Sequence, residues 1–255
     1  MIRVEDFSRL TDSEWRQHYE AEHGIFVAEG NKVIKRALAA GLQPLQVLCQ
    51  EKWLTEFSVY PNLPVEVLSE EALAEVVGFK FHRGALACFA RPAPLSMEQL
   101  LSLAGDGAAL VVCDSVVDHE NVGAIFRNAA ALGAGGVILT EGCVDPWYRR
   151  SLRVSMGTVF ELPFCIAPRR EAVLQGLAAH GVTQVALSID GDDSLQRLPA
   201  VGPIAFWLGS EGDGLPAVVE SAADFRCAIP MSRGVDSINV ATALAVALWS
   251  RREMR

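Results

Sequence analysis

The feature that most constrains this chain is the placement of glycines and polar residues beside strand-like apolar runs in its second half. Three such stretches occupy residues 121–127, 209–215 and 229–239. Around them, strand-like and helix-like segments alternate from residue 107 to 252. This alternation predicts an α/β fold with a mainly parallel sheet covered on both faces. Because open α/β sheets bind ligands at the carboxyl ends of their strands, the three stretches are the candidate ligand-binding segments.

The chain divides near Arg91-Pro-Ala-Pro-Leu-Ser96, where two prolines break both helix and strand. We predict a small N-terminal α/β domain over residues 1–92, a linker over 93–106 and a main domain over 107–255. Strands are expected at 25–29, 45–49, 65–68, 85–90, 109–113, 136–139, 184–189, 204–208 and 226–229, with strand or extended chain at 160–166. Helices are expected at 32–40, 70–77, 122–132, 146–155, 170–180, 216–223 and 238–252, after a first helical stretch that ends near Gly24.

Composition argues against several classes of protein. The apolar runs fall well short of the ~20 residues that a membrane-spanning helix needs, and the charged N-terminus shows no secretory signal. The six cysteines form no CxxC pair and the five histidines no ligand spacing, so we expect reduced thiols, a cytoplasmic location and no metal. The net charge of −9 argues against a generic nucleic-acid binder, although a local basic patch can still attract phosphate.

The first stretch places two polar residues at an apolar helix. Asn121 precedes the predicted helix, where a capping residue is favoured, so a purely structural N-cap is an open alternative. Arg127 lies among Ile125, Phe126 and Ala129, and arginine is seldom buried without a partner. Either an internal salt bridge holds Arg127, or the residue serves a site.

In the second stretch, Gly209 and Gly214 bracket Glu211 directly after a buried strand. Glycines there permit positive φ and close approach of the backbone to a ligand, although a tight strand-to-helix turn has the same pattern. Neither a P-loop nor a complete GxGxxG fingerprint is present. In the third stretch, Ser237 and Asn239 begin an apolar helix. Ser237 fits an N-cap, but Asn239 is less easily explained, because asparagine is disfavoured inside helices.

Together the three stretches closely resemble the motifs of the SpoU (TrmH-type) RNA 2′-O-ribose methyltransferases of the SPOUT superfamily. They are Asn121-Val-Gly-Ala-Ile-Phe-Arg127, Gly209-Ser-Glu-Gly-Asp-Gly-Leu215 and Ile229-Pro-Met-Ser-Arg-Gly-Val-Asp-Ser-Ile-Asn239. The resemblance covers most of residues 107–252 and implies a C-terminal trefoil knot. It is looser over residues 1–90, where Phe26-Val-Ala-Glu-Gly30 before a basic helix resembles the family's N-terminal substrate-binding domain.

The resemblance also implies the roles of individual residues. The catalytic set would be Asn121, Arg127, Glu211, Ser237 and Asn239. The cofactor, S-adenosylmethionine, would bind at Leu208, Gly209, Gly214, Ile229, Met231 and Ile238. Because an arginine side chain stays charged, Arg127 is expected to hold the target phosphate rather than to abstract a proton. The family more often has Leu at position 238 and Ser at position 241, where this chain has Ile and Ala.

We therefore expect a methyltransferase that acts on a ribose 2′-oxygen in structured RNA, ribosomal RNA before tRNA. Two other classes are alternatives. The complete polar set argues against a non-catalytic RNA-binding or ribosome-assembly factor, and the absence of the glycine fingerprint argues against a nucleotide-cofactor oxidoreductase. Basic residues are candidates for RNA contact, although each cluster can equally be a solvated face. These residues are Lys32, Lys35, Arg36, Arg149, Arg150 and Arg153.

The last predicted helix is apolar around much of its girth, with Val246 and Trp249 among its residues. A helix of this kind needs cover on more than one side. Enzymes of the resembled family pair through this helix and the helix of the first stretch, so we predict a two-fold homodimer. The alternative is a monomer in which residues 1–90 supply the second cover.

Overall fold

The computed structural model describes residues 7–81, 84–105, 107–140 and 142–253. They form two compact units. Unit 1 contains the chain up to Ala93 together with Asp145–Phe160, and unit 2 contains Pro94–Val144 and Glu161–Arg255. The predicted boundary near residue 92 coincides with the first crossing between units. The segment 145–160, however, packs with unit 1, although its place in the sequence had put it in the main domain.

Unit 1 is a four-stranded sheet with the strand order β1-β4-β2-β3. Its strands are β1 (Ile25–Glu29), β2 (Pro44–Cys49), β3 (Val65–Val67) and β4 (Ala85–Ala90), and its helices are α1 (Ser13–Glu22), α2 (Asn31–Ala39), α3 (Glu51–Phe57), α4 (Glu70–Val77) and α7 (Arg149–Val154). The short helix η2 (Thr158–Phe160) ends the returning segment. β4 runs antiparallel to both β1 and β2. All five residues of β1 are buried, which explains the continuous apolar run in the sequence.

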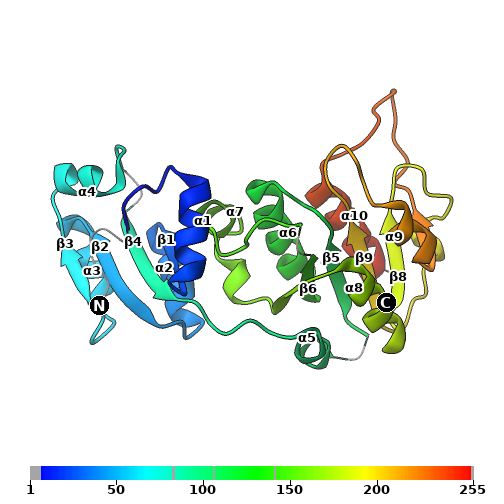
Figure 1. Ribbon diagram of the computed structural model, residues 1–255, viewed down its shortest axis with the longest axis horizontal. Coiled ribbons are helices and arrows are strands. Elements are labelled where there is room, and N and C mark those ends of the chain that lie inside the picture. Colours follow the sequence, from blue (N-terminus) through cyan, green and yellow to red (C-terminus); the bar gives the residue numbers. More distant parts are fainter. Residues whose placement is uncertain (1–6, 82–83, 106, 141, 254–255) are drawn as a thin grey trace. The chain divides into compact units, whose positions relative to one another are not determined.

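Unit 2 is built on a six-stranded sheet in which every neighbouring pair is parallel, as the alternation of segments predicted (Figure 1). The strand order is β10-β8-β9-β5-β6-β7. The strands are β5 (Ala109–Cys113), β6 (Ala134–Thr140), β7 (Phe164–Ala167), β8 (Thr183–Leu187), β9 (Ile204–Leu208) and β10 (Phe225–Cys227). The helices are α5 (Met97–Ala104), α6 (His119–Ala131), α8 (Arg170–Ala179), α9 (Ala217–Ala222), α10 (Val240–Glu253) and the short η3 (Leu195–Arg197).

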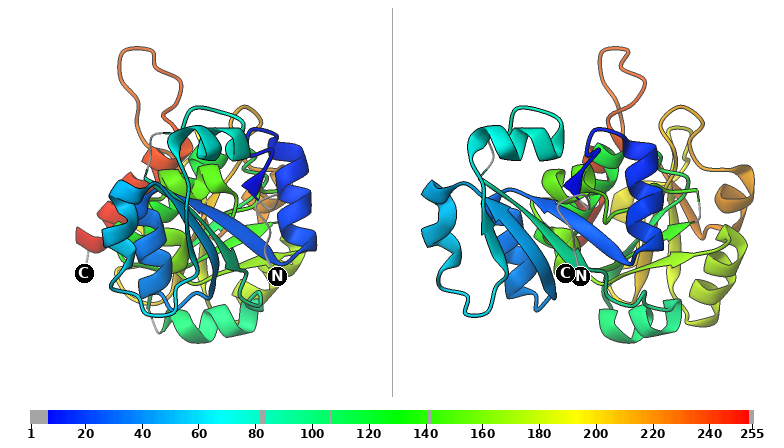
Figure 2. Two further views of the ribbon diagram at one scale, coloured as in Figure 1. Left: turned by 90° about the vertical axis from the view of Figure 1, so that its left-hand side faces the viewer. Right: turned by 60° about the vertical axis from the view of Figure 1, so that its left-hand side comes forward.

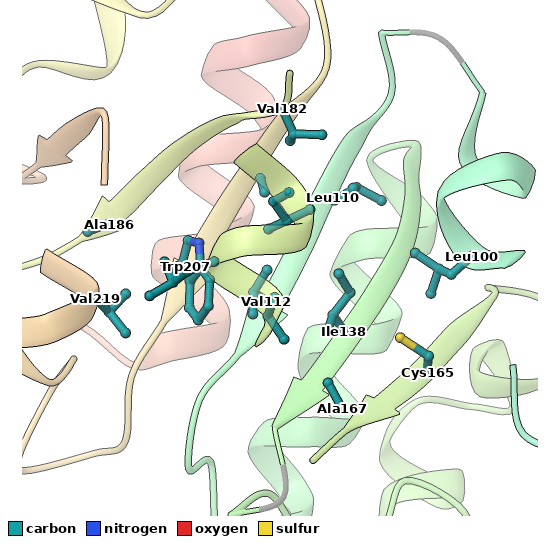
Figure 3. Close-up of a cluster of buried hydrophobic side chains, with 14 of the residues drawn as sticks. Leu100, Leu110, Val112, Ile138, Cys165, Ala167, Val182, Ala186, Trp207 and Val219 are labelled. Atoms are coloured by element: carbon teal, nitrogen blue, oxygen red, sulfur yellow. The ribbon is translucent and has the colours of Figure 1, made fainter. Parts of the chain in front are cut away.

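Alternating side chains send the sheet's apolar residues to both faces. On one face, Leu110, Val112 and Trp207 join residues of α5, α8 and α9 in a buried cluster (Figure 3). The Trp207 indole Nε1–H donates to Gln184 Oε1 at 3.2 Å, so its polar atom is satisfied inside the core. On the other face, α6 and α10 pack on the sheet and on each other.

The predicted linker over 93–106 is largely helix α5. Ser96 and Gln99 form a capping box, in which each side chain accepts a hydrogen bond from the other residue's backbone N–H. Leu100 is fully buried against the sheet of unit 2. Pro92 and Pro94 lie between β4 and α5, outside both elements. The irregular connection is shorter than the predicted linker, because the amphipathic helix α5 begins at Met97.

The order of the strands determines where a ligand can bind. From β5 the chain runs outward through β6 and β7, then returns on the other side through β8, β9 and β10. In open parallel sheets, the crevice beside such a reversal, at the carboxyl ends of the strands, is the usual ligand site. The structure does not test the trefoil knot, which remains a prediction of the resemblance.

Candidate active site

A pocket of about 890 Å³ lies at the carboxyl ends of β8, β9 and β10. It is lined by the segments that follow these strands, namely residues 187–190, 208–215 and 227–231, and by the start of α10. The connection from β10 to α10 extends away from the sheet in both views of Figure 2, where it is orange-red. The three stretches therefore converge on one edge of the sheet: the second and third line the pocket, and Asn121 of the first accepts a hydrogen bond from Asn239, a pocket residue.

Two glycines give the loop after β9 its shape. A Cβ on Gly209 would lie 2.2 Å from the backbone of Gly214, so only glycine fits there. Gly214 has φ +70°, which favours a residue without a Cβ, and its N–H donates to Ser210 O at 3.2 Å. The loop is thus a closed backbone turn that lines the pocket with main-chain atoms.

Asn239 joins the three stretches. Its Nδ2 donates to Asn121 Oδ1 at 2.7 Å and to Glu211 Oε1 at 3.1 Å. Its Oδ1 accepts hydrogen bonds from the N–H groups of Ala241 and Thr242, so the same side chain caps α10. The unusual asparagine at the start of the last helix is therefore an N-cap whose other end holds two polar residues of the site.

The structure corrects the expected position of Asn121. The cap of α6 is Asp118, which accepts hydrogen bonds from the N–H groups of Glu120 and Asn121. Asn121 itself lies in the first turn, with an exposed fraction of 7%, and directs its amide to Asn239. The helix begins earlier than predicted because the side chain of Asp118 satisfies its first N–H groups.

Arg127 is not brought into the pocket of its own chain. Its side chain is exposed on α6, and no residue among those described forms an ion pair with it. The internal salt bridge weighed from the sequence is therefore not seen within the described chain. The neighbouring residue Asn128 donates to Ala241 O at 2.8 Å, which fixes α6 against the beginning of α10.

All six predicted cofactor residues line the pocket, and so does Ser237. The pocket also contains a group that sequence reasoning missed, the residues Ser188, Ile189 and Asp190 after β8. Their only signal in the sequence was the end of a predicted strand. The charged side chains that line the pocket are all carboxylates: Asp190, Glu211, Asp213, Glu220 and Asp236. The pocket therefore favours a ligand that carries positive charge.

Thiol chemistry is not favoured at this edge of the sheet. All six cysteines are free, and Cys113 and Cys143 lie closest to the ends of β5 and β6. Burial raises the pKa of both thiols, well above its usual range for Cys113, so they remain protonated at neutral pH. Next to them, Arg170 Nε donates to the buried carboxylate of Asp114 at 3.1 Å. Among the described residues, no cluster of three His, Cys, Asp or Glu side chains could hold a metal ion.

The predicted RNA-contact residues all lie in unit 1 but differ in their partners. Arg149 is turned inward, where it forms an ion pair with the buried Glu29 and donates to Leu10 O, so it anchors α7 within unit 1. Lys35 Nζ lies 2.6 Å from Glu56 Oε2, and this hydrogen bond lowers the pKa of the Glu56 carboxyl. Arg36 Nη1 donates to Met156 O at 2.7 Å, while Lys32 and Arg150 are exposed.

Comparison with known proteins agrees with this arrangement. The model of the SpoU rRNA Methylase family matches residues 108–249. An uncharacterized tRNA/rRNA methyltransferase of Mycobacterium tuberculosis is 37% identical over 98% of this chain and 88% of its own length. A 23S rRNA (adenosine(1067)-2′-O)-methyltransferase of Streptomyces azureus is 31% identical over 86% of this chain and 82% of its own.

A solved structure shares the whole fold. The AdoMet-bound rRNA methyltransferase from Sinorhizobium meliloti superposes with a TM-score of 0.83 and 26% identity, over 98% of this chain and 94% of that one. No described helix is both long enough and apolar enough to cross a membrane. The family resemblance predicted from the three stretches is thereby confirmed, and the chain is a member of the SpoU rRNA methylase family.

Proposed function

We propose that this chain transfers a methyl group from S-adenosylmethionine to a ribose 2′-oxygen of ribosomal RNA, in the cytoplasm. As a SpoU-family protein it is an S-adenosylmethionine-dependent RNA 2′-O-methyltransferase. The observation that carries the proposal is the junction at Asn239, where polar residues of all three stretches meet beside the pocket. Ribosomal RNA is preferred over tRNA because relatives named as 23S rRNA methyltransferases match most of the chain.

The pocket fits the cofactor on its own geometry. The absence of a side chain at Gly209 lets the loop after β9 close against the backbone of Gly214, and this loop lines the pocket. Leu208, Ile229 and Ile238 supply apolar walls, while Asp190 and Asp213 place negative charge at the pocket. S-adenosylmethionine carries a net positive charge and, when bound, supplies an electrophilic methyl group on its sulfonium.

The polar residues would act mainly by positioning. Both the oxygen and the nitrogen of the Asn239 side-chain amide form hydrogen bonds, so its orientation is fixed. Asn239 in turn would keep the side chains of Asn121 and Glu211 in place beside the pocket. Ser237 lines the same pocket two residues earlier. Correct orientation of the reactants can lower the activation barrier by roughly 7–11 kcal/mol. The hydrogen-bonded junction at Asn239 would contribute by holding its polar residues in a single conformation.

We assign Arg127 to the target phosphate within a homodimer. Val246 and Trp249 on α10 are 38% and 53% exposed, while the opposite face of this helix is buried against the same unit. Arg127 is exposed on α6, the helix that packs against α10. Pairing of two copies through these helices would cover Trp249 and bring Arg127 to the shared interface.

The test is methyl transfer to RNA from cells that lack the gene. Purified protein and labelled S-adenosylmethionine are incubated with ribosomal RNA and, separately, with tRNA. Labelled dinucleotides that resist alkaline hydrolysis identify ribose 2′-O-methylation, because the modified oxygen cannot attack the adjacent phosphodiester. We expect them in ribosomal RNA with wild-type protein and their loss with Arg127→Ala, while calorimetry shows unchanged cofactor affinity. Label in tRNA alone would favour the alternative substrate, and binding of RNA without transfer would favour a non-catalytic factor.

A further inference from the structure

One buried carboxylate of unit 2 lies outside the pocket. Asp114 directly follows β5, and its side chain is fully buried. Its Oδ1 accepts a hydrogen bond from Arg170 Nε at 3.1 Å, and its Oδ2 has no hydrogen-bond partner among the residues that the structure describes. A carboxylate is costly to bury unless it is fully paired, and apolar residues in place of a buried ion pair are often at least as stable. Stability therefore does not account for this ion pair, whereas a need to hold a segment in place would.

The ion pair lies on the face of the sheet that α8 covers. Side chains alternate along a strand, so Asp114 points to the same face as Val112, which packs with residues of α8. Arg170 is the first residue of α8, and its Nη2 lies 3.5 Å from Ser115 Oγ. One guanidinium therefore contacts two successive side chains of the segment that leaves β5.

The backbone of the same segment is held on both sides. The N–H of Asp114 donates to Leu208 O at 2.8 Å, directly before Gly209 of the pocket loop. The N–H of Ser115 donates to Thr140 Oγ1 at 3.3 Å, at the end of β6. Ser115 has a φ of 58°, a strained conformation for a residue with a side chain, which persists only where its surroundings enforce it. The turn at Ser115 is therefore fixed by β9, β6 and α8 together.

This turn leads directly into α6. Asp118, the N-cap of that helix, follows four residues after Asp114. Asn121 lies in the first turn of α6 and accepts the hydrogen bond from Asn239 at 2.7 Å, and Arg127 lies farther along the same helix. A displacement of the turn would therefore reach two residues assigned to methyl transfer, while the segments that line the cofactor pocket follow other strands.

We propose that Asp114 and Arg170 are positioning residues for methyl transfer, whose ion pair holds the turn after β5 and thereby places α6 for the reaction. This inference rests on the proposed function for the reaction that is measured. Neither side chain lines the pocket, so both act through Asn121 and Arg127 rather than on the cofactor. A misplacement of about 1 Å caused far from the reacting atoms can cost about a hundredfold in rate, so loss of the ion pair should lower kcat.

The experiment compares wild type with Arg170→Gln, with the double variant Asp114→Val and Arg170→Leu, and with Arg169→Gln as the matched control. Arg169 is the neighbouring arginine, exposed at the N-cap of α8. The measurements are kcat and KM for methyl transfer to ribosomal RNA, cofactor affinity by calorimetry and the midpoint of thermal unfolding. Arg170→Gln should lower kcat about ten- to a hundredfold, with KM and cofactor affinity within about twofold of wild type. Arg169→Gln should keep the kcat of wild type.

The double variant separates positioning from stability. It removes the buried charge together with its partner, so its unfolding midpoint should recover toward that of wild type. Its kcat should stay as low as that of Arg170→Gln, because an apolar pair gives the turn no directional contact with Ser115. Recovery of kcat together with stability would show a merely structural role and overturn the proposal, as would an equal fall of kcat in Arg169→Gln.

Hydrogen exchange of the full-length protein reports on the turn without any methyl transfer. Backbone amides of residues 114–121 should exchange faster in Arg170→Gln than in wild type or Arg169→Gln. Unchanged exchange there would overturn the proposal even if kcat fell. A wild-type protein that transfers no methyl group would contradict the proposed function instead, and faster exchange in Arg170→Gln would still support the hold of the ion pair on the turn.

Discussion

Asn239 performs two tasks with the two ends of one amide, and a single substitution can separate them. The Oδ1 atom caps α10 through bonds of 3.0 and 3.3 Å, and Nδ2 donates to Asn121 and Glu211. Asn239→Asp keeps an acceptor at the cap but removes the donor and places a second carboxylate beside Glu211. Asn239→Ala removes both functions.

The magnitudes follow from the bonds that are lost. The N-cap is worth about 1 kcal/mol and is retained in the Asp variant, whose negative charge also suits a helix N-terminus. One hydrogen bond to a neutral acceptor and one to an exposed carboxylate together contribute about 2 kcal/mol. If these bonds position the site for transfer, kcat should fall about thirty-fold in Asn239→Asp. Asn239→Ala should lose similar activity and, in addition, about 1 kcal/mol of unfolding free energy.

The assay pairs initial rates of methyl transfer, at saturating cofactor and RNA, with urea denaturation of the same preparations. The rate of Asn239→Asp should also recover partly as the pH is lowered, because two adjacent carboxylates raise the pKa of one of them and its protonated form restores a donor. An Asp variant with activity within twofold of wild type would refute the positioning role. A loss of several kcal/mol of stability in the same variant would refute the separation of cap from site.

Three further changes test other parts of the structure. Gly209→Ala should lower cofactor affinity at least a hundredfold by calorimetry, because the new Cβ would collide with the backbone of Gly214. A Cβ on Gly214 meets open space, so Gly214→Ala should cost only the strain of its positive φ, about 1 kcal/mol. Equal losses of cofactor affinity in the two variants would contradict this reasoning. Burial raises the pKa of Glu20 to about 7, from a value of about 4.5 in the unfolded chain. Protonation of Glu20 therefore stabilises the folded state fully below pH 4.5, and this stabilisation is lost as the pH rises through 7. From pH 5 to pH 8, the free energy of unfolding of wild type should fall relative to that of Glu20→Gln by on the order of 2 kcal/mol. The same change in both proteins would show that the pKa of Glu20 is not raised. Trp249→Glu should convert a dimer to a monomer in sedimentation equilibrium, while Val201→Glu, at a position 83% exposed on a loop, should not; a wild-type monomer would remove the proposed interface.

The sequence alone determined the central architecture of unit 2 and the region of its site. The limits of β5 and β9 were predicted to the residue, because each is a continuous apolar run that ends at a polar residue or a glycine, as is typical of strands buried on both faces. Gly209 and Glu211 could be singled out because glycine and polar residues directly after such a strand serve a turn or a ligand. Asn239 could be singled out because asparagine is disfavoured inside the helix that it was predicted to begin. The family resemblance added their roles, which no periodicity could supply.

Tertiary structure alone decided which side chains meet. Helix α7 has the same local pattern whichever unit it packs against, and only contacts such as that between Phe26 and Trp147 assign it to unit 1. Arg149 and Arg150 are adjacent in the sequence, yet one is neutralised by a glutamate 120 residues away and the other is exposed. Hydrophobic periodicity reports how much of a residue is buried, whereas the partner of a charge depends on the path of the whole chain, and this difference separates a structural arginine from a candidate RNA contact.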